Sequence, residues 1–171
     1  MRHIALLRGI NVGGNRRVPM TSLKNTFERL GFTDVRTYIQ SGNVIFEAEK
    51  PDQHAIEEAL RVGFGFPVDV MLRSAGEWAA LASRNPYPAQ AAADGTKVHI
   101  AFLHDVPNPA RLDALRARTT GEELWECLGR ELYLYTPRGM GQSRLSLAPL
   151  GQPVTVRNWR TVQEIGEMLR G

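Results

Sequence analysis

The feature that most constrains the fold is one order of strand and helix signals that occurs twice along the chain. In the first half, short runs of β-branched and aromatic residues alternate with stretches that have helical spacing. The first six signals are strand, helix, strand, strand, helix and strand, at 3–7, 19–31, 35–39, 44–46, 51–63 and 68–72. This order is that of the split βαββαβ unit of ferredoxin-like folds.

The same order returns after Gly95, which ends an Ala-rich segment without periodicity. The second series of signals is strand, helix, strand, strand, short helix and strand, at 98–103, 108–115, 124–128, 132–135, 141–147 and 154–156. A final helix is expected to turn Trp159, Val162, Ile165 and Leu169 inward. The repeat lies in the order of elements, and none is expected at the level of residues.

The sequence therefore predicts an α+β protein with two ferredoxin-like (βαββαβ, alpha-beta plait) subdomains, antiparallel sheets and a C-terminal helix. Each subdomain is expected to contain four strands and two helices. The boundaries are 1–72 for the N-terminal subdomain, 73–96 for a connecting helix and linker, and 97–171 for the C-terminal subdomain with the terminal helix. The connecting helix begins at Ser74, which is followed by Glu77 at capping-box spacing.

Composition excludes several classes of protein. A hydrophobic fraction of 43% in 171 residues is too high for a disordered chain. No apolar run approaches the ~20 residues of a membrane span, and the N-terminus lacks a signal-peptide pattern. A single cysteine, Cys127, forbids an intramolecular disulfide. We therefore expect a cytoplasmic protein without a membrane partner.

Charge gives a weak indication of the partner. The chain has 21 basic and 18 acidic residues, and the positive excess lies in the first 50, with 8 basic against 4 acidic. Nucleic-acid binders usually cluster their basic residues on one face, whereas here only Arg16 and Arg17 are adjacent. Scattered, solvated arginines remain the alternative to a partner that is a nucleic acid or an anionic small molecule.

Two loops separated by about 30 positions are predicted to lie at the same edge of the first sheet. One follows the first strand and the other joins the second and third strands. Glycines in these loops would let a ligand approach the backbone, and arginines would attract an anion. The predicted ligand-binding rim consists of Arg8, Asn11, Gly13, Gly14, Asn15, Arg16, Gln40, Ser41 and Asn43. The alternative is a tight turn at Gly13 and Gly14 that is merely solvated by its polar neighbours.

A second candidate stretch is 155–161, where Arg157 and Asn158 are added to the predicted ligand-binding residues. Asn158 also suits an N-cap, so a structural role is the alternative. The segment 139–144 is another Gly-broken entry to a helix, and Ser143 could cap it or meet an anion.

No catalytic constellation can be assembled, and no metal site or cofactor is expected. Ser41 lacks a nucleophile elbow, and Cys127 in a strand pattern beside Trp125 is expected to be buried and unreactive. His99 and His104 are five residues apart, so on one strand they would face opposite sides.

Several motifs resemble those of a bacterial family, domain of unknown function (DUF) family 1697. They are LLRGINVGG (6–14), RVPM (17–20), YIQSGNV (38–44), NPY (85–87) and TVRNWRTV (155–162). The resemblance implies two ferredoxin-like plaits and no established reaction, substrate or cofactor. Family members usually carry G-x-G-x-S-K-L-T-N after the last hairpin. Here residues 139–146 fit loosely, and Leu147 stands where a polar residue is expected.

Three classes of function therefore remain open. The first is a protein that binds an anionic or phosphate-bearing ligand, such as a nucleotide or RNA, at the N-terminal rim. The second is an enzyme that acts on a phosphate-bearing metabolite through arginines and backbone amides. The third is a structural or self-associating module that uses open sheet edges. The oligomeric state is not determined by the sequence.

Overall fold

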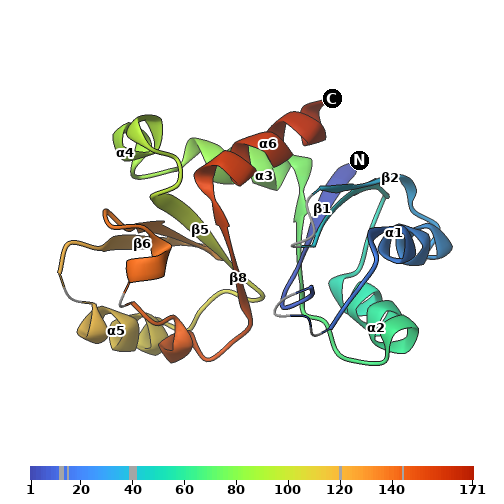
Figure 1. Ribbon diagram of the computed structural model, residues 1–171, viewed down its shortest axis with the longest axis horizontal. Coiled ribbons are helices and arrows are strands. Elements are labelled where there is room, and N and C mark those ends of the chain that lie inside the picture. The colour runs from blue at the N-terminus through green and yellow to red at the C-terminus, as the bar shows by residue number, and fades with distance from the viewer. Residues whose placement is uncertain (12–13, 15, 39–41, 120, 144) are drawn as a thin grey trace. The chain divides into compact units, whose positions relative to one another are not determined.

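The computed structural model describes residues 1–11, 14, 16–38, 42–119, 121–143 and 145–171 (Figure 1). The chain divides into two compact units, each of which is described by itself. The first unit contains residues 1–79 and 165–171, and the second contains residues 80–164.

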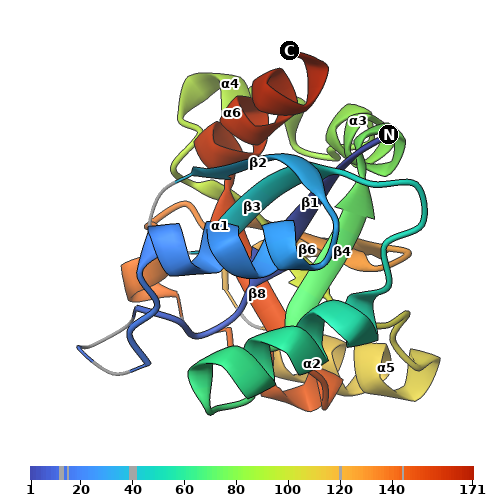
Figure 2. The same ribbon diagram turned by 90° about the vertical axis from the view of Figure 1, so that its right-hand side faces the viewer.

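The first unit contains a four-stranded antiparallel sheet. Its elements are, in chain order, β1 (Arg2–Leu7), α1 (Met20–Arg29), β2 (Thr33–Tyr38), β3 (Asn43–Glu47), α2 (Gln53–Phe64) and β4 (Val70–Ser74). The strand order is β2-β3-β1-β4, and every pairing is antiparallel. Both helices lie on the same face of the sheet (Figure 2), where Phe27, Phe46 and Leu60 are fully buried. Helix α3 (Ala75–Ser83) begins directly after β4.

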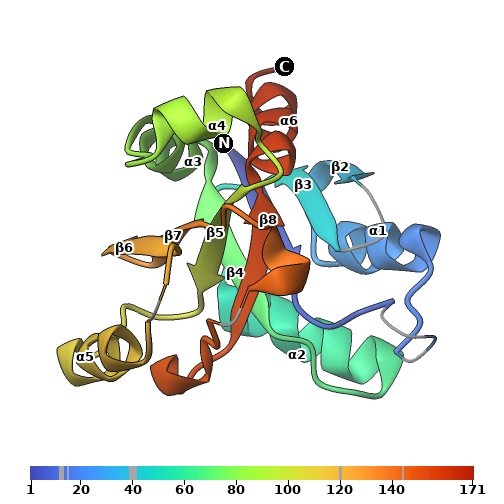
Figure 3. The same ribbon diagram turned by 60° about the vertical axis from the view of Figure 1, so that its left-hand side comes forward.

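The second unit repeats the sheet but not all the helices. It contains α4 (Pro88–Ala93), β5 (Val98–Leu103), α5 (Pro109–Arg118), β6 (Leu124–Leu128), β7 (Glu131–Tyr135), the 3₁₀ helices η1 (Met140–Gln142) and η2 (Ala148–Leu150), β8 (Val154–Asn158) and the start of α6 (Trp159–Arg170). The strand order is β6-β7-β5-β8, again antiparallel (Figure 3). Helix α5 packs beside η2.

The predicted fold class is confirmed, since both sheets have the ferredoxin-like strand order. The helix expected at 141–147 is wrong. The described residues between β7 and β8 form only η1 and η2, because two glycines and Pro149 interrupt any helical run. The Ala-rich segment before β5 was expected to be a linker, but it forms α4. Pro88 stands in the first turn of this helix, and alanine is the strongest helix former.

A repeat at the level of residues appears once the strands are aligned by register, and the expectation that none exists is therefore wrong. Strand β1 contains His-Ile-Ala-Leu-Leu at 3–7, and β5 contains His-Ile-Ala-Phe-Leu at 99–103. Ile4 pairs with Arg73 of β4, and Ile100 pairs in the same way with Arg157 of β8. The two units thus have the same residue types at equivalent strand positions as well as the same topology.

Side chains begin the helices where the sequence predicts. Asp52 accepts a hydrogen bond from the His54 N–H at the start of α2, and Asn108 accepts one from the Ala110 N–H at the start of α5. The Ser74 hydroxyl accepts from the Glu77 N–H at the start of α3. Among the described residues, no helix is long and apolar enough to cross a membrane.

Candidate functional site

The β1–α1 connection, residues 8–19, has both ends fixed in the core of the first unit. Ile10 and Val18 are 1% and 2% exposed. Asn11 closes the loop between them, because its Nδ2 donates to the Val18 carbonyl and its Oδ1 accepts from the Val18 N–H, at 3.1 and 2.9 Å. Its backbone φ is +55°, in the left-handed region that asparagine tolerates better than most residues. Asn11 is therefore a structural clamp rather than a free ligand-binding group.

The arginines of this loop are exposed. Arg8 makes one surface ion pair with Asp69, with 3.4 Å between Nη1 and Oδ2 and side chains 52% and 39% exposed. The Arg16 guanidinium lies 5.6 Å from the centre of the Phe66 ring. A Cβ added to Gly9 would lie 3.8 Å from Arg16 Nη1. The Arg16 guanidinium therefore lies beside Gly9, the neighbour of Arg8 in the sequence. The loop thus concentrates positive charge in one place.

Gly42, which directly precedes β3, lies against the start of this loop, as the topology predicts. The Leu7 N–H donates to the Gly42 carbonyl at 2.8 Å. A Cβ added to Gly42 would lie 2.9 Å from Leu7 Cβ and 3.0 Å from Ile10 Cδ1, so the close approach requires glycine. Four predicted rim residues lie outside the described residues: Gly13, Asn15, Gln40 and Ser41.

A hollow of about 410 Å³ is formed by residues of the loop and the first residue of α1. Its lining includes Asn11, Gly14, Arg17 and Met20. Pro19 precedes the helix and cannot cap it, and among the described residues no side chain bonds to its first N–H groups. Arg17 therefore lies beside a recess where backbone donors are left without side-chain acceptors.

The predicted ligand residues Asn43 and Asn158 make hydrogen bonds within their own unit. Asn43 is fully buried, and its Nδ2 donates to the Tyr38 carbonyl at 2.8 Å, across the end of the β2–β3 hairpin. Asn158 lies in the second unit and caps α6 by accepting from the Thr161 N–H at 2.9 Å. The alternative structural role is the one that these contacts support.

Arg157 is a buried cation of the second unit. Its Nη1 donates to the Thr155 hydroxyl at 2.6 Å and to the Val156 carbonyl at 3.1 Å, and burial lowers its pKa to about 10. The equivalent Arg73 of the first unit is 1% exposed and donates to the Leu72 carbonyl. Because both units bury an arginine at this position, the shared fold explains the burial of Arg157 without a ligand.

The cysteine is half-buried rather than fully buried, because β6 is an edge strand. It lies on the core face with Trp125, as the strand alternation predicts, and burial followed by the charge of Glu131 raises the pKa of its thiol. A raised pKa keeps the thiol protonated and weakly nucleophilic.

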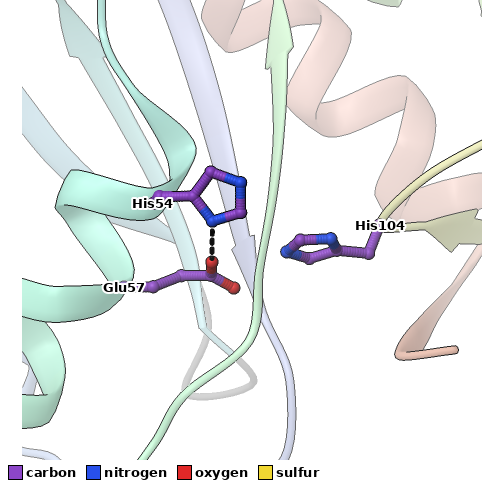
Figure 4. Close-up of side chains that lie close together, drawn as sticks. All are labelled: His54, Glu57 and His104. Atoms are coloured by element: carbon purple, nitrogen blue, oxygen red, sulfur yellow. Dashed lines mark ion pairs between the residues drawn. The ribbon is translucent and has the colours of Figure 1, made fainter.

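Two of the histidines, His54 and His104, have local carboxylate partners. The His54 ring points toward the Glu57 carboxylate one turn further along α2, at 3.3 Å (Figure 4), and His104 Nδ1 lies 3.0 Å from Asp105 Oδ2. Because β5 ends at Leu103, His104 follows the strand rather than lying on its opposite face from His99.

Two features were missed by sequence reasoning. Arg17 lines the hollow, and its adjacency to Arg16 was the available signal. The equivalence of Arg73 and Arg157 could have been found from the matching His-Ile-Ala stretches at 3–5 and 99–101, which fix the alignment of the two halves.

Known proteins that are similar to this chain give it a family but no activity. The family described as "Protein of unknown function (DUF1697)" matches residues 1–133. A solved structure of the conserved bacterial protein SP0830 from Streptococcus pneumoniae matches with a TM-score of 0.79 and 25% sequence identity, covering 99% of this chain and 98% of that chain. No curated protein matches this chain.

Proposed function

The chain belongs to the DUF1697 family, and since that family has no known function, we propose one from the loop itself: the β1–α1 loop binds an anionic, phosphate-bearing ligand. The observation that carries the proposal is the gathering of the exposed Arg8, Arg16 and Arg17 on one clamped loop. Among the described residues, only Asp69 forms an ion pair with any of the three. The loop therefore keeps an excess of positive charge for a ligand.

The physical case rests on how little the loop must reorganise. Ile10, Val18 and the Asn11 clamp fix both ends of the loop before any ligand arrives, so binding does not have to order these ends. Guanidinium groups form charge-assisted hydrogen bonds with phosphate oxygens that are about twice as strong as neutral ones. The hollow beside Arg17 has room for a phosphate group, and the uncapped N–H groups of α1 add donors.

Nucleotides and RNA are the sources of phosphate that we propose, with a cytoplasmic location that the single free thiol supports. We propose binding rather than catalysis, because the described loop residues offer cations and amides but no nucleophile or general base. A single-stranded RNA and a mononucleotide differ in the number of phosphates that they bring, and salt dependence measures that number.

The experiment is calorimetric titration of the protein with inorganic phosphate, AMP and a short single-stranded RNA at two salt concentrations. The double variant Arg16→Ala/Arg17→Ala is compared with Lys24→Ala/Arg29→Ala, which removes the same charge from exposed positions on α1. We expect the loop variant to bind at least tenfold more weakly and the control to bind like the wild type. Equal affinity in the two variants would overturn the proposal, because net charge alone would then explain binding.

A further inference from the structure

The second unit contains a larger cavity that the proposed phosphate site does not use. Its volume is about 550 Å³, and it lies between the segment before β5 and the first turns of α6. Its lining includes Asn85, Ala92, Asp94, Trp159, Arg160 and Gln163. Two sequence motifs contribute to one wall, NPY at 85–87 through Asn85 and TVRNWRTV at 155–162 through Trp159 and Arg160.

Gly95 fixes the shape of the cavity. The Trp159 N–H donates to the Gly95 carbonyl at 3.2 Å, which joins the start of α6 to the turn after α4. A Cβ added to Gly95 would lie 3.1 Å from Arg160 Cγ, so the close approach depends on glycine. A backbone hydrogen bond therefore joins the two segments that line the cavity.

The lining combines an aromatic ring with amide groups. Trp159 is half-buried and offers a flat apolar surface. Gln163 is exposed at the rim, and its amide is both a donor and an acceptor. Asn85 Oδ1 accepts from the Tyr87 N–H at 2.9 Å, while its buried Nδ2 has no partner among the described residues. A ligand acceptor that reaches this wall would supply that partner.

The charges of the lining offset one another. Arg160 is the cation and Asp94 the carboxylate. Hydrogen bonds from Thr96 lower the pKa of Asp94, and the charges of Lys97 and Arg160 lower it further, so the carboxylate is ionised. A lining without net charge favours a neutral ligand over an anion, which separates this cavity from the β1–α1 loop.

We propose that this cavity binds the base of a nucleoside. A planar, neutral heteroaromatic ring fits the Trp159 surface, because bases stack favourably on aromatic side chains. Amides such as those of Asn85 and Gln163 match the paired donor and acceptor on the edge of a base. The volume lies within the range of small-molecule sites, roughly 300–1,000 Å³.

The test is a titration with adenosine, cytidine and uridine, followed by the tryptophan indole N–H signals in nitrogen-15 NMR spectra. These ligands carry no phosphate, so the result is independent of the phosphate site. Trp78 and Trp125 are buried, and the signal of Trp159 is identified by its loss in Trp159→Phe. We expect at least one nucleoside, at millimolar concentration, to shift the Trp159 signal and leave the other two unchanged.

Matched variants decide whether the shift comes from the cavity. Ala92→Phe fills the cavity, whereas Ala89→Phe adds the same ring to an exposed position of α4 outside the lining. We expect the first variant and Gln163→Ala to lose the response and the second to keep it. A Trp159 signal that no nucleoside shifts would overturn the proposal, as would an equal response in Ala92→Phe or an equal shift with ribose alone.

Discussion

The two units have the same sheet but differ in the connection that follows the first strand. In the first unit this connection occupies residues 8–19, and in the second unit it occupies only 104–108. A side-chain amide holds each connection, from within it in the first unit and from the segment before β8 in the second. Asn11 bonds to both backbone groups of Val18, and Gln152 bonds to both backbone groups of Asp105, at 2.8 and 3.0 Å. The added length in the first unit contains the exposed arginines, so the candidate site lies where the two units differ.

The turn glycines near these two connections also differ, in how closely other residues pack against them. Gly42 of the β2–β3 turn and Gly129 of the β6–β7 turn both have positive φ, +87° and +65°. A Cβ at Gly42 would collide with Leu7 and Ile10, whereas a Cβ at Gly129 would meet nothing within 4 Å. The first unit therefore packs Gly42 against the long loop, whereas the space around Gly129 in the second unit is open. Loops with function on a conserved scaffold are commonly built in this way.

The largest expected loss of stability tests whether the sheets of the two units are equivalent. Leu7 and Leu103 occupy the same register position, each opposite the first residue of the last strand, and both are buried. We expect Leu7→Ala and Leu103→Ala each to lower the free energy of unfolding by about 3 kcal/mol, measured by urea denaturation. The control Val62→Ala, at an exposed helix position, is expected to cost less than about 0.5 kcal/mol. A small cost at only one of the two leucines would contradict the equivalence.

The second prediction compares the turn glycines. Gly42→Ala combines an unfavourable backbone conformation with overpacking, so we expect a loss of about 3 kcal/mol in the free energy of unfolding. Gly129→Ala suffers only the conformational cost, about 1 kcal/mol. Thermal melts of both variants measure the difference, and equal costs would show that the contact with the long loop contributes nothing.

The third prediction compares the two amide clamps. Asn11→Ala removes two hydrogen bonds and places alanine at positive φ, so we expect a loss of about 2 kcal/mol in the free energy of unfolding. Gln152→Ala removes two more exposed bonds, with a loss of about 1 kcal/mol. If the loop binds phosphate, Asn11→Ala also weakens that binding and Gln152→Ala leaves it unchanged. Calorimetric titration of both variants with phosphate separates the two effects.

The fourth prediction concerns the equivalent histidines, His3 and His99. Burial lowers the pKa of each below the ordinary value of about 6.5, so the unfolded chain binds a proton first as the pH falls. The stability of the neutral form is therefore present above about pH 6.5 and is lost below it. For His3 the hydrogen bond with the Met1 carbonyl raises the pKa and offsets part of the burial.

Unfolding titrations between neutral and acidic pH measure this contribution. We expect His99→Gln to remove more of the acid-induced loss of stability than His3→Gln. A larger reduction in His3→Gln, or none in either variant, would contradict this assignment.

The smallest effect on stability is expected at Arg8. Its ion pair with Asp69 is exposed, and exposed pairs contribute about 0–1 kcal/mol. Arg8→Ala should therefore leave the melting temperature nearly unchanged while it weakens phosphate binding. An early melting transition would show that Arg8 acts in the structure rather than in binding a ligand.

The sequence by itself determined which segments of both units form the strands and the main helices. A short, nearly continuous apolar run specifies a buried strand, as at 98–103, and a capping residue followed by helical spacing specifies a helix start, as at Asp52 and Asn108. These are local signals, and the connection order restricts how the strands can pair. The closeness of the β1–α1 loop to the β2–β3 turn followed from that topology, and the contact of Leu7 with Gly42 agrees with it.

Only the tertiary structure decided which polar residues are free to act. Asn43, Asn158 and Arg157 are indistinguishable from ligand-binding residues in the sequence, yet their hydrogen bonds serve the hairpin, the α6 cap and a buried strand. Burial depends on contacts between residues far apart in the chain, which local patterns do not specify. The cavity at Trp159 has the same origin, because it requires α6 to start against Gly95, about 60 positions earlier in the chain.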